Sequence, residues 1–180
     1  HPTQGLLDML AWTNSLATLD LSGRTLGIVG DVLHSRVARS AAYAASCLGS
    51  DVVFIGPPAM VPESVQGLLE GLEGAGRGSL RIAHDLDATL PQLDAAMMLR
   101  VQFERGAELT GDYAGMFGMN SERAQSLPSH AVILHPGPIN RGIELDDATA
   151  DGDRSLILDQ VTCGVAARMA VLAEQLGRHI

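Results

Sequence analysis

Short apolar segments alternate with helix-forming segments along most of the 180-residue chain, and this alternation constrains its fold more than any other feature. The apolar segments are four or five residues long and span residues 25–29, 51–55, 80–83, 95–99 and 131–134. Short, mostly apolar segments of this kind are typical of strands that are buried on both faces of a sheet. Because helical segments separate them, we predict a Rossmann-like α/β fold, with a parallel sheet and helices on both faces.

The expected helices span residues 2–19, 35–48, 63–72, 86–90, 121–126 and 155–176. Glycine-bearing loops are expected at residues 74–78 and 106–118, the second with a short helix inside it. The first and last helices flank an α/β unit that is otherwise complete. We therefore expect their apolar faces to be partly uncovered in this chain, or covered by another chain.

Composition and charge exclude several classes of partner. The formal net charge is -9, and every one of the twelve basic residues is arginine. A net-negative surface argues against nucleic acid and against anionic membranes, and no apolar stretch approaches the length of a membrane span. The two cysteines, Cys47 and Cys163, lie far apart without a metal-ligand spacing, so we expect reduced, buried thiols in a cytosolic protein.

Arginine follows the first predicted strand at the edge where ligands bind in open parallel sheets. Arg36 and Ser35 stand at the start of a helix, where backbone N–H groups favour an anion and a guanidinium can hold a carboxylate. The alternative is a surface arginine paired with a nearby acid, and the residues alone leave both readings open. A dinucleotide site is disfavoured because GxGxxG is absent and only Gly27 and Gly30 are available.

A second arginine, Arg100, follows the strand at residues 95–99, and Gln102 lies two residues further on. If the backbone stays extended, the two side chains point to the same side. The alternative for Arg100 is a structural ion pair, for instance with Glu104. Two arginines at neighbouring strand ends would suit a small dicarboxylate.

The loop at residues 135–138 (HPGP) follows the last predicted strand. Its two prolines have no N–H, so its carbonyl groups are free to accept hydrogen bonds from a ligand, and its glycine permits a close approach. The alternative is simply a rigid connection.

Five segments together resemble the catalytic chain of aspartate carbamoyltransferase. They are HPTQGLLD, GIVGDVLHSRVARS, MMLRVQFER, HPGPINRGIE and ADGDRSLILDQVTCGVAARMAVL. They occur in this order from the first residues to the last helix, and the likeness extends over essentially the whole chain. The resemblance implies an enzyme that transfers the carbamoyl group of carbamoyl phosphate to the amino group of L-aspartate, an early step of pyrimidine (UMP) biosynthesis in the cytoplasm. It implies no metal and no cofactor.

The resemblance also implies a role for each strand-end residue on the aspartate side. Arg36 and Arg100 would bind the two carboxylates of L-aspartate, and Gln102 would support them.

On the carbamoyl phosphate side, the resemblance implies that His1 is catalytic, because it would hydrogen-bond the carbamoyl oxygen and polarise it. Gln4 would hold the carbamoyl amide, and Gly137 and Pro138 would offer backbone carbonyls to the carbamoyl nitrogen. We also expect a cis peptide bond between Gly137 and Pro138, as is usual in the family.

The domain division implied by the resemblance has three parts. Residues 1–20 form an interdomain helix that carries one end of the carbamoyl phosphate site, residues 21–150 form the L-aspartate-binding domain, and residues 151–180 form a helix that returns toward a missing N-terminal domain. That domain would grip the phosphate, so we expect this chain to be inactive alone. The implied partners are a homotrimer of full-length chains and a larger assembly with other pyrimidine-pathway subunits.

Two alternatives stay open. Ornithine carbamoyltransferases resemble this family, but they carry HCLP where this chain has HPGP, and their substrate offers one carboxylate and a cation. The chain could also be a non-catalytic amino-acid-binding or assembly module, because the partner domain is missing.

Overall fold

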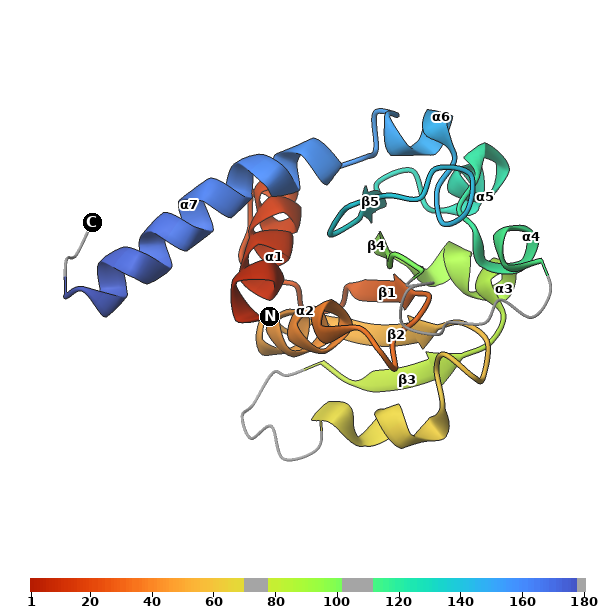
Figure 1. The fold of residues 1–180 in the computed structure, drawn as a ribbon, viewed down its shortest axis with the longest axis horizontal. Helices are drawn as coiled ribbons and strands as arrows, with labels where there is room; N and C mark the ends of the chain where they lie inside the picture. Colours follow the sequence, from red (N-terminus) through yellow and green to blue (C-terminus); the bar gives the residue numbers. More distant parts are fainter. Residues whose placement is uncertain (70–77, 102–111, 178–180) are drawn as a thin grey trace.

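A five-stranded parallel sheet forms the centre of the computed structural model, which describes residues 1–69, 78–101 and 112–177 (Figure 1). The strands are β1 (Thr25–Val29), β2 (Asp51–Ile55), β3 (Leu80–Ala83), β4 (Ala95–Met98) and β5 (Val132–Leu134). Their order across the sheet is β3-β2-β1-β4-β5, and all the pairs are parallel. The predicted α/β fold is therefore confirmed.

The helices follow the prediction closely, with local differences at their ends. They are α1 (Pro2–Leu16), α2 (Arg36–Cys47), the 3-10 helix η1 (Glu63–Leu69), α3 (Leu86–Thr89), the 3-10 helix η2 (Leu90–Gln92), α4 (Tyr113–Phe117), α5 (Ser121–Ser126), α6 (Asp147–Ala150) and α7 (Ile157–Gln175). The first helix ends earlier than predicted because Ala17 adopts a left-handed conformation with φ 52°. The short helix α6 was not predicted, whereas α4 is the short helix that was expected within residues 106–118. Residues 74–77 and 106–111 of the two predicted loops lie outside the described residues.

Small side chains on α2 allow this helix to pack closely on the sheet. Its buried face consists of Ala38, Ala41, Ala42, Ala45 and Ser46, and it belongs to the same core as the strand residues. The helix α1 joins this core through Trp12, the largest side chain that is fully buried.

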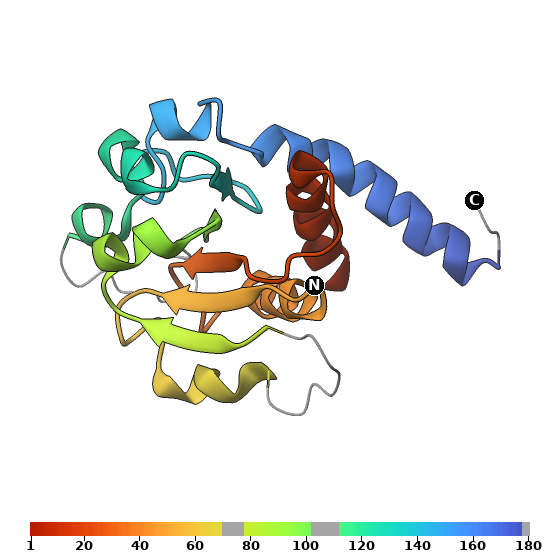
Figure 2. The same ribbon diagram turned by 180° about the vertical axis from the view of Figure 1, so that it is seen from behind.

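The helices α1 and α7 pack against each other beside the sheet, and both views show α7 extending past α1 (Figures 1 and 2). Their contact is a small separate cluster of Leu7, Ala11, Cys163 and Ala167.

The other face of α7 carries five apolar side chains that are 60% to 80% exposed: Leu158, Val161, Val165, Met169 and Leu172. Their spacing of three or four residues makes them one continuous stripe, which we call the α7 stripe. On α1, Leu6 is 48% exposed. The expectation that both terminal helices leave apolar surface uncovered is confirmed.

The expectation of two buried cysteines is wrong for one of them. Cys163 is buried between α1 and α7, whereas Cys47 is exposed. Cys47 is the last residue of α2, two positions after Ala45, and two positions turn a helix by roughly 200°, away from the buried face. Among the residues that the structure describes, no helix is long and apolar enough to cross a membrane.

Candidate functional site

The loops that follow β1, β4 and β5 open at one edge of the sheet, because these three strands are neighbours and run parallel. The strand order reverses between β1 and β4. Such a switch point is where open α/β sheets bind their ligands. The structure thus brings the three predicted loops together at the expected place.

Arg36 is the first residue of α2, and its helix start is fixed by a side-chain cap. The hydroxyl of Ser35 accepts a hydrogen bond from the Ala38 N–H at 3.1 Å. The Arg36 side chain is exposed, and it makes no ion pair with any residue that the structure describes. Arg36 is therefore not a surface arginine paired with a described acid, and its guanidinium is available to an anion.

The turn between β1 and α2 is held by a buried acid and a glycine. Asp31 is almost fully buried, and its Oδ1 accepts the His34 N–H at 3.2 Å and lies 2.9 Å from His34 Nδ1. Gly30 has φ +120°, and a β-carbon there would lie 2.9 Å from the Tyr113 hydroxyl. Burial, together with the charges of Glu144 and Asp31, raises the pKa of that hydroxyl.

Arg100 lies two residues beyond the end of β4 and is half-buried. The next residue, Val101, is fully buried, and its carbonyl accepts a hydrogen bond from Asn140 Nδ2 at 3.2 Å. This bond ties the end of β4 to the loop that follows β5. Gln102 and Glu104, the predicted neighbours of Arg100, lie outside the described residues.

The loop after β5 has the predicted cis peptide bond between Gly137 and Pro138. The Gly137 N–H donates to His135 Nδ1 at 2.8 Å, so the ring hydrogen of a neutral His135 resides on Nε2. That Nε2 lies 3.4 Å from Glu144 Oε1, and both side chains are fully buried. Glu144 Oε1 also accepts the Asn140 N–H at 2.7 Å. The buried side chains of His135 and Glu144 therefore hold this loop in place through its backbone N–H groups.

A second set of buried polar groups joins this loop to both terminal helices. Asp8 Oδ1 accepts hydrogen bonds from Gln4 Nε2 and from Gln160 Nε2, each at 2.7 Å. Gln160 Oε1 in turn accepts the backbone N–H of His135 at 2.9 Å. We call these four residues the helix–loop network. Burial of Asp8 raises the pKa of its carboxyl group to about 6, although the two amide hydrogen bonds act in the opposite direction.

An open pocket of about 190 Å³ lies over the helix–loop network. It is lined by Gln4, Leu7, His135, Pro136, Gly137, Ile157, Gln160, Val161 and Arg168. The structure thus brings Gln4 and Gly137, two of the predicted carbamoyl phosphate residues, to one cavity. His1 is exposed at the start of α1, where its carbonyl accepts the N–H groups of Gln4 and Gly5. Pro138 is also exposed, while Arg36 and Arg100 do not line this pocket.

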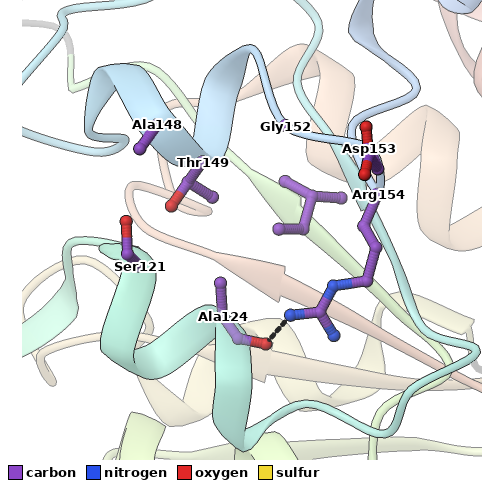
Figure 3. A pocket seen from close by; sticks show the side chains of 8 residues that line it. Ser121, Ala124, Ala148, Thr149, Gly152, Asp153 and Arg154 are labelled. Atoms are coloured by element: carbon purple, nitrogen blue, oxygen red, sulfur yellow. Dashed lines mark hydrogen bonds between the residues drawn. The ribbon is translucent and has the colours of Figure 1, made fainter.

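A larger pocket of about 310 Å³ lies away from these residues, between α5, α6 and the segment before α7 (Figure 3). Arg154 lines this pocket, and its guanidinium group donates hydrogen bonds to the backbone carbonyls of Ala124 and Pro128. Those bonds hold α5 and the turn before β5 in place. None of the predicted site residues lines this pocket, so we assign it a structural role.

Sequence reasoning missed Asp8, Gln160 and Glu144. Asp8 could have been found from the sequence, because it interrupts the apolar face of α1 and lies four residues after Gln4. Helix side chains at this spacing contact each other. Gln160 could not, since 152 residues separate it from Asp8 and only the packing of α1 on α7 brings them together.

Comparison with known proteins places these features in a family. The profile of "Aspartate/ornithine carbamoyltransferase, Asp/Orn binding domain" matches residues 22–174. The aspartate carbamoyltransferase catalytic subunit of Myxococcus xanthus is 49% identical over 176 residues, which are 96% of this chain and 55% of the relative. That of Rhodococcus opacus is 47% identical, over 96% of this chain and 52% of the relative.

Solved structures of the same family superimpose closely. The ornithine carbamoyltransferase from Pyrococcus furiosus matches with a TM-score of 0.83 at 25% identity, over 96% of this chain and 55% of that chain. The aspartate transcarbamoylase from Trypanosoma cruzi, in complex with N-(phosphonacetyl)-L-aspartic acid, matches with a TM-score of 0.78 at 26% identity, over 96% and 53%. The chain spans about half the length of the curated relatives it matches.

Proposed function

The chain belongs to the aspartate/ornithine carbamoyltransferase family, and from this we propose that it is the L-aspartate-binding part of an aspartate carbamoyltransferase. The whole enzyme transfers the carbamoyl group of carbamoyl phosphate to the amino group of L-aspartate, in the pyrimidine (UMP) pathway of the cytoplasm. It uses neither a metal nor a cofactor. Its catalytic power comes from bringing two anions together and from stabilising the charge of the transition state.

L-aspartate binds at the switch point of the sheet. Arg36 and Arg100 each hold one carboxylate, since a guanidinium group pairs with a carboxylate through two parallel hydrogen bonds. Gln102 supports the same substrate. The observation that carries the proposal is the position of the two arginines, which follow the neighbouring strands β1 and β4. One of them is exposed without a described ion pair.

The carbamoyl group binds beside the helix–loop network. Gln4 and the carbonyls of Gly137 and Pro138 hold its NH2, and His1 donates to its oxygen and so favours negative charge there. The amino nitrogen of aspartate bonds to the carbamoyl carbon, the bond from that carbon to the phosphate oxygen breaks, and phosphate leaves while the nitrogen loses a proton. The phosphate is held by another domain of the whole enzyme.

We further propose a domain division that follows this chemistry. Residues 1–20 carry one end of the carbamoyl phosphate site, residues 21–150 bind L-aspartate, and residues 151–180 run toward a carbamoyl phosphate domain. That domain covers the α7 stripe and Leu6, which are the apolar surfaces left open on the two terminal helices. Full-length chains assemble as trimers and join larger complexes with other pyrimidine-pathway subunits.

Calorimetry on this chain tests the aspartate site. We expect weak binding of L-aspartate and of succinate, and we expect Arg36→Ala or Arg100→Ala to weaken it by roughly ten- to a hundred-fold, as removal of a charge-assisted hydrogen bond does. Arg81→Ala is the matched control, because Arg81 is an exposed arginine on β3 whose guanidinium donates to Gln92. Equal binding by all three variants would rule out the proposed site.

The full-length polypeptide that contains this chain tests the reaction. We expect carbamoyl-aspartate from carbamoyl phosphate and L-aspartate, and no product with L-ornithine, because two arginines repel a substrate that ends in a cation. Citrulline as the product would assign the chain to the ornithine enzymes. If the full-length polypeptide forms no product and this chain binds neither amino acid, the alternative of a non-catalytic assembly module would be supported instead.

A further inference from the structure

Asp8 is a fully buried carboxylate. It lies on α1 between Leu7 and Met9, which are both buried, and its exposed fraction is 0%. One of its oxygens, Oδ1, accepts two amide hydrogen bonds of 2.7 Å, while Oδ2 has no partner among the described residues. Burying a carboxylate this deeply is unfavourable unless hydrogen bonds compensate for the lost hydration. The two hydrogen bonds to Gln4 and Gln160 therefore indicate what Asp8 does.

The ionised carboxylate decides which way the Gln4 amide points. A carboxylate can only accept, so Gln4 must turn its NH2 toward Asp8 and leave its Oε1 on the other side. Gln4 lines the pocket shared with Gly137, and its Oε1 makes no hydrogen bond to any described residue. Asp8 therefore makes Gln4 present an acceptor to the pocket rather than a donor.

The same carboxylate controls the loop through Gln160. With its NH2 on Asp8, Gln160 has its Oε1 free to accept the His135 N–H at 2.9 Å. The Gly137 N–H is bonded within the loop to His135 Nδ1, and the prolines at 136 and 138 have no N–H.

As a result, every backbone N–H from residue 135 to residue 138 is either absent or bonded. The carbonyls of Pro136, Gly137 and Pro138 accept no hydrogen bond from the residues that the structure describes. The loop and the Gln4 amide thus offer acceptors only. A ligand group that carries two N–H bonds matches such a surface, whereas a methyl group or a carboxylate does not.

We infer that Asp8 is a positioning residue for carbamoyl recognition: it orients Gln4 and Gln160 so that the Gln4 amide and the loop at residues 135–138 present only acceptors to the NH2 of the carbamoyl group. This inference rests on the proposed function, and it adds a residue that touches no substrate. Its consequence is selectivity between carbamoyl phosphate and acetyl phosphate, which differ by NH2 against CH3.

The test uses the full-length polypeptide that contains this chain, with acetyl phosphate as a competitive inhibitor. The readout is the inhibition constant for acetyl phosphate divided by the KM for carbamoyl phosphate. We expect Asp8→Ala to lower this ratio by about tenfold, because both glutamine amides lose the partner that fixes them. The KM for L-aspartate should stay close to its original value.

Asp8→Asn is the conservative variant. Its amide oxygen can accept both glutamine N–H groups, and its NH2 takes the place of Oδ2, so it should restore most of the selectivity that Asp8→Ala loses. Thr13→Val is the matched control, because Thr13 is a buried polar residue of the same helix whose hydroxyl only bonds the Met9 carbonyl and that of Leu10. It should change stability without changing the ratio.

If Asp8→Ala fails to fold, Gln160→Met still tests the inference. This variant leaves the bond between Asp8 and Gln4 and detaches only the loop, so we expect a smaller fall in the ratio, about threefold, on the loss of one of the two links. An unchanged ratio in Asp8→Ala or Gln160→Met, or an Asp8→Asn variant as unselective as Asp8→Ala, would overturn the inference. An original enzyme that does not use carbamoyl phosphate at all would instead overturn the proposed function.

Discussion

Gly30 combines a left-handed backbone conformation with a close contact. Its φ is +120°, and a β-carbon there would lie 2.9 Å from the Tyr113 hydroxyl and 3.3 Å from the Leu99 β-carbon. We expect Gly30→Ala to lower the free energy of unfolding by roughly 2–3 kcal/mol, from backbone strain and crowding. Gly23→Ala is the control, since Gly23 has φ +75° with nothing within 4 Å. It should lose about 1 kcal/mol in urea unfolding. Equal losses would show that crowding at Gly30 is unimportant.

The carboxyl group of Asp8 makes stability depend on pH. Burial raises its pKa to about 6 in the folded chain, from an ordinary value of 3.8. The folded state then binds this proton more tightly than the unfolded state does, so the contribution of Asp8 to stability is fully present below pH 4 and is lost as pH rises through 6.

Asp8→Asn removes this dependence, because its amide does not titrate. The free energy of unfolding of this variant, minus that of the original chain, should therefore rise by up to about 3 kcal/mol between pH 4 and pH 7.5. Urea unfolding at several pH values measures the difference. A difference that is constant across this range would mean that Asp8 does not titrate as its burial requires.

The start of α2 is fixed by its cap, and its first residue, Arg36, is a proposed ligand of aspartate. Ser35→Ala removes the hydrogen bond to the Ala38 N–H, and we expect a loss of about 1 kcal/mol in unfolding experiments. Ser35→Asp should keep the cap and most of the stability. If alanine and aspartate at this position behave alike, the cap contributes nothing.

The strands and most helices could be predicted because their patterns are local. A run of four or five mostly apolar residues before a glycine or a polar turn predicts a strand from the local sequence, as in Thr25–Val29. The ends of elements were less accurate, since they depend on backbone conformations such as that of Ala17.

The candidate site was only partly predictable for a different reason. Strand-end residues such as Arg36 and Gly137 can be located from the order of the elements. The bond between Asp8 and Gln160 depends on tertiary packing across 152 residues, and no pattern in the sequence encodes it. The substrate roles of Arg36 and Arg100 remain predictions.

At the scale of the whole molecule, the α7 stripe is an extended apolar surface that no described residue covers. We expect this chain to self-associate through the stripe, because five apolar side chains in one row form the kind of patch that proteins bury. Replacing Val165 and Met169 with glutamine should make the chain monomeric in analytical ultracentrifugation. Its stability should change by less than about 0.5 kcal/mol, as is usual for exposed positions.

The same two substitutions should act differently in the full-length polypeptide. If a second domain covers the stripe there, they should lower its stability by several times that amount. Leu19→Gln is the control, since Leu19 is 71% exposed and does not belong to the stripe. Equal and small effects in both proteins would contradict the proposed domain contact.

The single tryptophan of the chain gives this molecule a built-in optical reporter. Trp12 is fully buried where α1 meets the core, on the same helix as Gln4 and Asp8. We therefore expect its emission to be blue-shifted while α1 is packed on the core, and to shift to the red when water reaches the indole. Because no other tryptophan contributes, the fluorescence spectrum follows the docking of this one helix without any label, and it separates release of α1 from melting of the sheet measured by circular dichroism.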